Sequence, residues 1–464
     1  MTETLRGSGV RGRGGGAGWL LIATTSAGAV NYGYALAMTH GLAPAEFAAF
    51  AAGQALLLVR TTISSAAVSW VLAREVGRAG GDLERQAVVT SFAFWSNIVL
   101  GVALTVLLVA GVMLFGSAGD AVILAAASLI LSIGSTGMGY LQGTGRITAI
   151  AGLLTLEAVV KAVTGAGLVF GAHWQSAGAL GGFAAGSLVL LVPVLASRRL
   201  LRRPTWGPAQ TDLLRAAVRQ VRLQANVAVT AAADSVIVAV LGLGSAAAPY
   251  QAASALGRVP LFVSNAVSTA TFAALSRDGS ARRKADAIRT YLLVAAVMAA
   301  VLMTLPPPIR RLLLPDTFAA VDRWLPYAAV LGLAVGLLNL VVTVLQADDS
   351  RGRAVRTLTG TTVAYLAVVG LSGVAYGVAG VAVSATVGAL TVVLLPLLVL
   401  PALRPAVRLL LTSRRSARDA GVLALATTAL AVVDDPVAWV GVAAVSGAVA
   451  LAMAFPEFTP RRWR

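Results

Sequence analysis

Long apolar stretches, separated by short polar and basic segments, run along almost the whole chain. A helix that crosses a membrane needs about 20 consecutive, mainly apolar residues, and the pattern predicts about fourteen such helices. Only glycine separates the eleventh of them from the twelfth. The predicted spans lie near residues 18–40, 44–73, 87–116, 119–141, 148–171, 176–196, 222–242, 246–276, 288–309, 324–346, 357–376, 378–403, 419–433 and 437–455.

The composition supports a membrane protein over a soluble one. Of all residues 58% are hydrophobic and 12% are charged, whereas soluble domains have about 25% charged residues. So little polar material cannot cover a water-facing surface, and we expect an all-α polytopic membrane protein. The chain has no cysteine, which excludes disulfides and thiolate chemistry. It also shows no nucleotide-binding loop, no pair of carboxylates at a membrane surface and no metal-ligand cluster. We therefore predict neither an enzyme nor a cofactor.

The basic residues predict the orientation. If the N-terminus is cytoplasmic, Arg310, Arg311 and Arg323 are the only cations on the outer side, and Arg60, Lys161 and Arg258 lie within spans. All the other basic residues then lie on the cytoplasmic side, as the positive-inside rule predicts. Both termini are accordingly expected in the cytoplasm, with residues 1–17 as a disordered tail. The formal charge of +17 is explained by this orientation, so no nucleic-acid partner is predicted.

Several short patterns recur at a nearly constant separation and indicate an internal duplication. We predict two homologous six-helix lobes, residues 18–196 and 221–403, joined by a basic cytoplasmic linker at 197–220. Residues 404–464 add a basic loop, helices 13 and 14, and a cytoplasmic tail. Parallel repeats of this kind are typical of transporters, whose substrate sites lie at the interface of the halves. The matched pairs are Gly41-Leu42 with Gly242-Leu243, Leu141-Gln142 with Leu345-Gln346, Gly178 with Gly380, Gly186 with Gly388, and Pro193 with Pro396.

Two arginines lie deep in repeat-related spans, Arg60 in the second and Arg258, just before Pro260, in the eighth. A charge at this depth is costly and faces a cavity or a partner. One interpretation pairs each arginine with Asp234 or with carbonyl groups as interhelical contacts. The interpretation we favour is a cationic cavity for an anionic substrate, because the planar guanidinium binds phosphate through two parallel hydrogen bonds.

Other polar groups within the spans complete the candidate site. Asp234 in the seventh span is either a counter-ion for one of the arginines or a cation or proton site. Glu157 and Lys161 are four residues apart and are expected to neutralise each other. The remaining candidates for lining a cavity are Asn31, Tyr32, Tyr34 and Gln54.

Three segments resemble a known family. NYGYALAMTHGLAPAEFAAFAAGQALLLVR (31–60) resembles the opening of bacterial polysaccharide-biosynthesis membrane proteins, the oligosaccharide flippases. DSVIVAVLGLGSAAAPYQAASALGRVPLFVSNAVSTATFAALS (234–276) resembles the start of their second half, and LQGTGRITA (141–149) resembles their loop between spans 4 and 5. This family belongs to the superfamily of multidrug, oligosaccharidyl-lipid and polysaccharide exporters, which also contains the lipid II flippases.

The resemblance implies a V-shaped, alternating-access transporter in a bacterial cytoplasmic membrane. It would carry undecaprenyl-pyrophosphate-linked sugars outward for cell-surface polysaccharide biosynthesis, and the family's cavity arginines would map onto Arg60 and Arg258. The partners implied are the lipid-linked glycan, the bilayer, and glycosyltransferases or a polymerase. Lipid II flippases carry further basic residues in the first span, and this span has none.

Two alternatives remain open. A cation-coupled exporter of small organic cations has the same fold but needs cavity carboxylates, for which Asp234 is the candidate. A non-transporting scaffold would recruit glycosyltransferases through basic cytoplasmic segments such as residues 198–210.

Overall fold

The fold is known from a computed structural model, which describes residues 13–64, 68–80, 82–196, 207–243, 246–277, 279–347 and 351–455. These residues contain helices and no strand. Each of the fourteen predicted spans coincides with helix, which confirms the all-α polytopic fold. Within the described residues, ten helices are long and apolar enough to cross a membrane. The count is below fourteen partly because one long helical element contains two spans and because one span is divided into two shorter helices.

The first six predicted spans form one set of helices. The second span, expected over 44–73, contains α2 and α3, and residues 65–67 between them lie outside the described residues. The helices are α1 (Arg13–Gly41), α2 (Pro44–Ser64), α3 (Trp70–Ala79), α4 (Leu83–Val112), α5 (Ala118–Gly143), α6 (Ile147–Ala166), the π-helical η2 (Gly167–Gly171), α7 (Gln175–Val189) and α8 (Val192–Leu195).

The second set follows the same order. The eighth span is divided at Arg258, and α9 begins at Pro208, inside the segment expected to be a linker. Proline suits this position because the first turn of a helix needs no amide donor. The helices are α9 (Pro208–Val240), α10 (Ala247–Gly257), α11 (Val259–Arg277), α12 (Ala281–Met303), α13 (Pro307–Leu313), the 3-10 helix η5 (Asp316–Arg323), α14 (Leu325–Ala347) and α15 (Arg351–Val399).

The element α15 is a helical hairpin that contains the eleventh and twelfth spans. It turns at Gly377, whose φ of 62° is costly for a residue with a side chain. The two arms pack closely, since a Cβ atom at Gly388 would lie 2.6 Å from the Tyr365 ring. In the first half, a Cβ atom at Gly186 would lie 2.9 Å from Cβ of Lys161. These matching contacts are what an internal duplication predicts.

The last three helices, α16 (Arg404–Thr412), α17 (Arg414–Val432) and α18 (Pro436–Ala454), pack against α12. Arg289 of α12 forms a largely buried ion pair with Asp419 of α17. In the first turn of α18, Trp439 Nε1 donates a hydrogen bond to Thr304 Oγ1, directly after α12, at 3.3 Å. The appendage is therefore fixed to the second set of helices at both of its ends.

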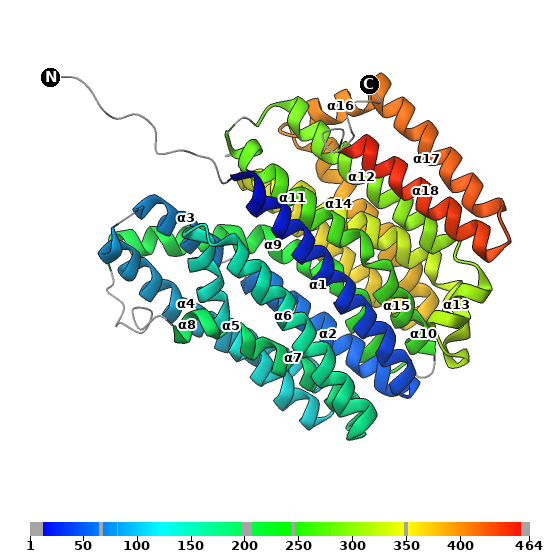
Figure 1. The fold of residues 1–464 in the computed structure, drawn as a ribbon, viewed down its shortest axis with the longest axis horizontal. Coiled ribbons are helices and arrows are strands. Elements are labelled where there is room, and N and C mark those ends of the chain that lie inside the picture. The colour runs from blue at the N-terminus through cyan, green and yellow to red at the C-terminus, as the bar shows by residue number, and fades with distance from the viewer. Residues whose placement is uncertain are drawn as a thin grey trace.

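Segments that the arginine pattern assigns to the same side of the membrane lie together. The start of α1, α3 and α16 lie toward one end of the helices, whereas α10 and α13 lie toward the other (Figure 1). The first group carries the segments that we expected in the cytoplasm. The proposed scaffold segment is largely outside the described residues, as are residues 1–12 of the expected tail.

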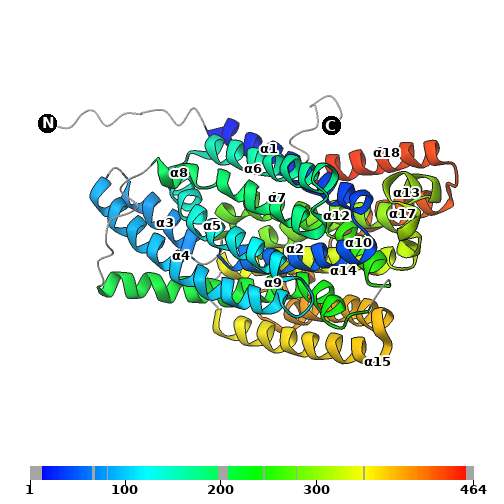
Figure 2. The same cartoon turned by 90° about the horizontal axis from the view of Figure 1, so that it is seen from below.

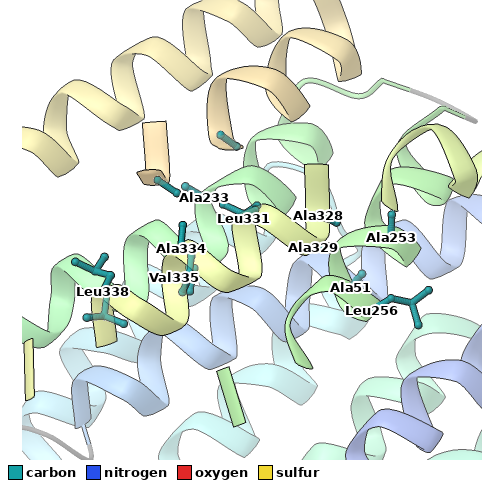
Figure 3. Close-up of a cluster of buried hydrophobic side chains, with 14 of the residues drawn as sticks. Ala51, Ala233, Ala253, Leu256, Ala328, Ala329, Leu331, Ala334, Val335 and Leu338 are labelled. Atoms are coloured by element: carbon teal, nitrogen blue, oxygen red, sulfur yellow. The ribbon is translucent and has the colours of Figure 1, made fainter. Parts of the chain in front are cut away.

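Two groups of helices are visible, α4 to α8 on one side and α12, α14 and α16 to α18 on the other, with α1 crossing between them (Figures 1 and 2). Between the groups, α2 packs along α9. The core at this level is rich in alanine, with Ala51 of α2 near Leu256 of α10 (Figure 3). Small side chains let helix backbones approach closely, which is how helices associate in lipid.

Candidate functional site

Arg258 lies where the eighth span breaks, between α10 and α11. Gly257 packs so closely on α14 that a Cβ atom there would collide with the backbone oxygen of Ala328. Pro260 follows in the first turn of α11, where it has no amide hydrogen to donate. These two features fix the break and place the arginine at a helix end in the interior of the protein.

Asp234 of α9 is the counter-ion of this arginine. Its Oδ1 lies 3.6 Å from Nη2 of Arg258, which also donates a hydrogen bond to Ser235 Oγ at 2.7 Å. The other carboxylate oxygen accepts hydrogen bonds from Tyr250 at 3.0 Å and Ser254 at 2.8 Å. Asp234 is completely buried, whereas the Arg258 side chain keeps 20% of its surface exposed. The carboxylate is thus enclosed, and the guanidinium retains an accessible part.

The helix α1 passes this break from the opposite set of helices. A Cβ atom at Gly28 would lie 3.3 Å from the ring of Phe262. Further along, Tyr32 and Leu256 line one small cavity. Because Arg258 lies between Leu256 and Phe262 in the chain, these two contacts place it level with α1 near Tyr32.

Asn31 and Gln54 belong to the same region. The side-chain oxygen of Asn31 is buried and has no hydrogen-bond partner. Gln54 is half-buried on α2 and lies two turns from Phe47, on the same face of the helix, and Phe47 lines the cavity shared by α1 and α10. The structure therefore places Tyr32, Gln54 and Arg258 along the interface between the two sets of helices, and Asn31 precedes Tyr32 on α1.

Arg60 lies elsewhere. On α2 it shares a face with Gly53, which packs on Leu124 and Leu180 of the first set of helices. Its Nη2 donates a hydrogen bond to Ser132 Oγ, its Nε has no partner, and only 3% of the residue is exposed. No ion pair to Arg60 occurs among the described residues. In this conformation the two arginines do not share a site, and Asp234 pairs with Arg258 alone.

A ladder of small polar residues receives Arg60 between α4 and α5. Its outer rungs are Asn97 to Thr136 at 2.8 Å and Thr105 to Ser128 at 2.6 Å. The middle rung is Ser132, opposite Gly101, where any side chain would collide with the serine hydroxyl. Polar residues recur every four positions on α5, at Ser128, Ser132 and Thr136, and eight positions apart on α4, at Asn97 and Thr105. This pattern was the sequence signal for the ladder, which we did not predict.

Two other polar candidates have local partners. Lys161 forms an ion pair with Glu157 at 3.1 Å, as predicted, and lies 4.8 Å from the centre of the Phe183 ring. Tyr34, expected to line a cavity, is buried and donates a hydrogen bond to the carbonyl oxygen of Ala179 at 2.5 Å. It joins α1 to α7 and so has a packing role.

The end of the interface near α13 is closed. Phe47 of α2 and Phe318 of η5 make an edge-to-face contact with ring centroids 5.3 Å apart. Phe318 is completely buried, and Leu314 covers the cavity next to Tyr32. Aromatic contacts of this kind join the two sets of helices on the side that the arginine pattern assigns to the exterior. Among the described residues, no three or more potential metal ligands are grouped together.

The fold is shared with membrane transporters of known structure. It is similar to the lipid II flippase MurJ in an inward closed conformation, with a TM-score of 0.69 and 15% identity, over 94% of this chain and 99% of that chain. It is also similar to an inward-facing multidrug resistance MATE family transporter of the MOP superfamily, with a TM-score of 0.62 and 16% identity, over 85% and 99%. For the eukaryotic MATE transporter AtDTX14 the TM-score is 0.59 and the identity 13%, over 87% and 97%.

No family model and no curated protein matches the sequence. The structural similarity confirms the all-α polytopic membrane fold that the sequence predicted. It covers the appended helices as well, because the match to MurJ extends over almost the whole of both chains.

Proposed function

We propose that this protein moves a polyprenyl-pyrophosphate-linked oligosaccharide across the bacterial cytoplasmic membrane, for the biosynthesis of a cell-surface polysaccharide. The observation that carries the proposal is Arg258, a cation with an accessible part at the interface of the two sets of helices. The fold supports it, since that interface is where transporters with repeated halves bind their substrates. Glycosyltransferases or a polymerase would supply and consume the glycan.

Arg258 is suited to a pyrophosphate. Asp234 and Ser235 hold one terminal nitrogen of the guanidinium, which fixes its orientation and leaves the other nitrogens to donate to phosphate oxygens. Asn31, whose buried oxygen has no partner, and Tyr32 supply polar groups for sugar hydroxyls. The substrate must enter after the two sets of helices separate, because the cavity now present is far smaller than a glycolipid.

Arg60 has a different part in this proposal. In the closed conformation it is bonded to Ser132 within the first set of helices, and no carboxylate among the described residues neutralises its buried charge. Such a charge raises the positive potential of the first set of helices, which favours an anion in the neighbouring interface. We therefore expect Arg60 to affect the rate of transport less than Arg258.

The test is the sidedness of a pyrophosphate-linked glycolipid in proteoliposomes. Wild type should move it, Arg258→Ala should slow the movement by about 10- to 100-fold through loss of a charged contact, and Arg60→Ala should slow it less. The double variant Glu157→Gln/Lys161→Gln removes a pair that is already neutral and serves as the matched control. Wild-type rates in Arg258→Ala would contradict the proposal.

One observation favours a second candidate, a cation-coupled exporter. Asp234 is a completely buried carboxylate whose Oδ1 accepts no hydrogen bond, and such a group could exchange a proton or a cation. In that case Asp234→Asn should abolish the efflux of a cationic dye driven by an imposed proton gradient, and no glycolipid should move. Retention of dye efflux in Asp234→Asn would exclude this candidate.

A further inference from the structure

The short helix α16 has two faces of different chemistry. Ala406 is buried, and Leu410 packs against the core. On the opposite face, Arg404 and Arg408 are one turn apart and exposed. The leucines beside them also remain exposed, Leu411 by 81% and Leu409 by 43%. Arginines flanked by exposed leucines are typical of a helix that lies at the boundary between lipid headgroups and acyl chains.

The first turn of α17 continues the basic surface. Arg414, Arg415 and Arg418 are exposed. The single carboxylate nearby, Asp419, is 4% exposed and is engaged by Arg289 of α12. Arg418 also lies 3.7 Å from the Asp419 carboxylate. Across this junction the protein therefore supplies four further exposed arginines, Arg404, Arg408, Arg414 and Arg415, and no accessible acidic side chain.

Some of the other exposed arginines in the described part of the chain have acidic partners. On α3, Arg74 and Arg78 bind Glu75 at 3.2 Å and 2.8 Å. On α9, Arg215 binds Asp212 at 3.1 Å. By contrast, no ion pair joins Arg408, Arg414 or Arg415 to another described residue. The positive-inside rule explains why arginines are here, but it does not explain the exposed leucines, Leu409 and Leu411, that accompany them on α16.

The basic surface is also held in place. Lys284 Nζ at the start of α12 donates a hydrogen bond to the carbonyl of Ala402 at 3.2 Å, just before α16. Arg404 Nε donates to the carbonyl of Leu398 at 2.9 Å, which ties α16 to the end of α15. Ser413 accepts a hydrogen bond from the amide of Arg415 at 3.2 Å and so caps α17. The guanidinium groups are thus presented from a backbone that is anchored on two sides.

We propose that α16 and the first turn of α17 bind the phosphate headgroup of an anionic glycerophospholipid. Arg404, Arg408, Arg414 and Arg415 contact the phosphate, and Leu409 and Leu411 contact the upper part of the acyl chains. The site is separate from the interface that carries Arg258, and it does not depend on what the protein transports. A bound lipid supplies the counter-charge that the protein lacks at this junction.

The experiment uses the full chain in mixed micelles that contain phosphatidylglycerol and phosphatidylcholine in equal amounts, with bound lipids counted by native mass spectrometry. Wild type should retain phosphatidylglycerol preferentially. Arg408→Gln/Arg415→Gln should lower that preference on the order of tenfold, since each arginine near a lipid surface contributes appreciably to binding. Arg74→Gln/Arg78→Gln removes the same charge from arginines that are already paired, and it should leave the preference nearly unchanged.

Folding of each variant is checked by its thermal unfolding midpoint in phosphatidylcholine alone. Arg408→Lys/Arg415→Lys keeps the charge and should keep most of the preference, which separates loss of binding from loss of structure. An equal decrease in both glutamine double variants would show a general charge effect and overturn the proposal. Absence of any preference in wild type would overturn it as well.

Discussion

The two halves of the molecule each bury an arginine in the second helix of the repeat, and they treat it differently. In the second half, Arg258 has a carboxylate partner, Asp234, and a helix break that places it at the interface. In the first half, Arg60 lies within a continuous helix and points away from the interface, and among the described residues its one hydrogen-bond partner is the hydroxyl of Ser132. Arg60 also lies further along its helix than Arg258. It is 16 residues after Pro44, the first residue of α2, whereas Arg258 is 11 residues after Ala247, the first residue of α10.

The difference shows that a duplicated position does not carry a duplicated role. A buried ion pair is neutral as a unit and depends on both of its members. A buried cation that is bonded only to neutral groups keeps its charge and its desolvation cost. The second half therefore fixes its arginine in place, whereas the first half maintains an unbalanced charge.

The largest effect is expected from breaking the ion pair. Asp234→Ala leaves Arg258 without a counter-ion and should destabilise the protein by about 3–5 kcal/mol. Arg60→Met should cost far less, because it replaces an unbalanced charge with an apolar side chain of similar length. Thermal unfolding of the purified protein measures both. The double variant Asp234→Ala/Arg258→Ala should recover part of the lost stability. Equal losses of stability in Asp234→Ala and Arg60→Met would contradict the distinction between the halves.

A smaller effect is expected from the hydroxyl partners. Ser132→Ala removes the one hydrogen-bond partner of Arg60 and should cost about 1.5–3 kcal/mol, as for hydrogen bonds to charged groups. Ser235→Ala should cost less, about 1 kcal/mol, because Arg258 keeps Asp234. Unfolding midpoints of the two variants give the comparison directly. A larger loss in Ser235→Ala would mean that the pairing of Arg258 is weaker than its geometry indicates.

A still smaller effect is expected from the aromatic contact between Phe47 and Phe318, which closes one end of the interface. Phe318→Ala removes an aromatic contact worth about 0.5–1.5 kcal/mol beyond its buried area, which should favour separation of the two sets of helices. Because the chain contains no cysteine, Thr39→Cys beside the cavity can serve as a single label site. When Phe318→Ala is added to Thr39→Cys, labelling of this cysteine by a membrane-impermeant maleimide should become faster by up to about tenfold. Trp174→Ala, at an exposed aromatic residue, should leave the rate unchanged.

The smallest effect is expected where charge is already balanced. Glu157→Gln/Lys161→Gln removes both members of a local pair and should change stability by less than about 1 kcal/mol. Either single substitution should cost more, since it leaves its partner charged and largely buried. A double-mutant cycle on unfolding midpoints separates these cases. A large loss in the double variant would show that the pair is needed for packing.

Much of the fold could be predicted from the sequence, because apolar run length is a direct consequence of bilayer thickness. The turn of α15 at Gly377 followed from glycine alone. The start of α9 at Pro208 was missed because its basic first turns look like a loop on a hydropathy scale.

The candidate site was only partly predictable. The pairing of Asp234 was one of the alternatives, and the structure selects Arg258 as its partner. The direction of Arg60 could not be foreseen, because periodicity places a side chain on one face of a helix without identifying the neighbour of that face. Only the packing of Gly53 on Leu124 and Leu180 shows that this face of α2 is directed toward the first set of helices and not toward the interface.

The length of α9 has a mechanical consequence. From Pro208 to Asp234 the helix is unbroken, so about 39 Å of stiff rod separates its first turn from the carboxylate that holds Arg258. A tilt of about 10° around Asp234 displaces the first turn by roughly 7 Å over that length. The helix therefore acts as a lever, and a spin label on Asp212 would register small rotations at the interface as displacements large enough to measure.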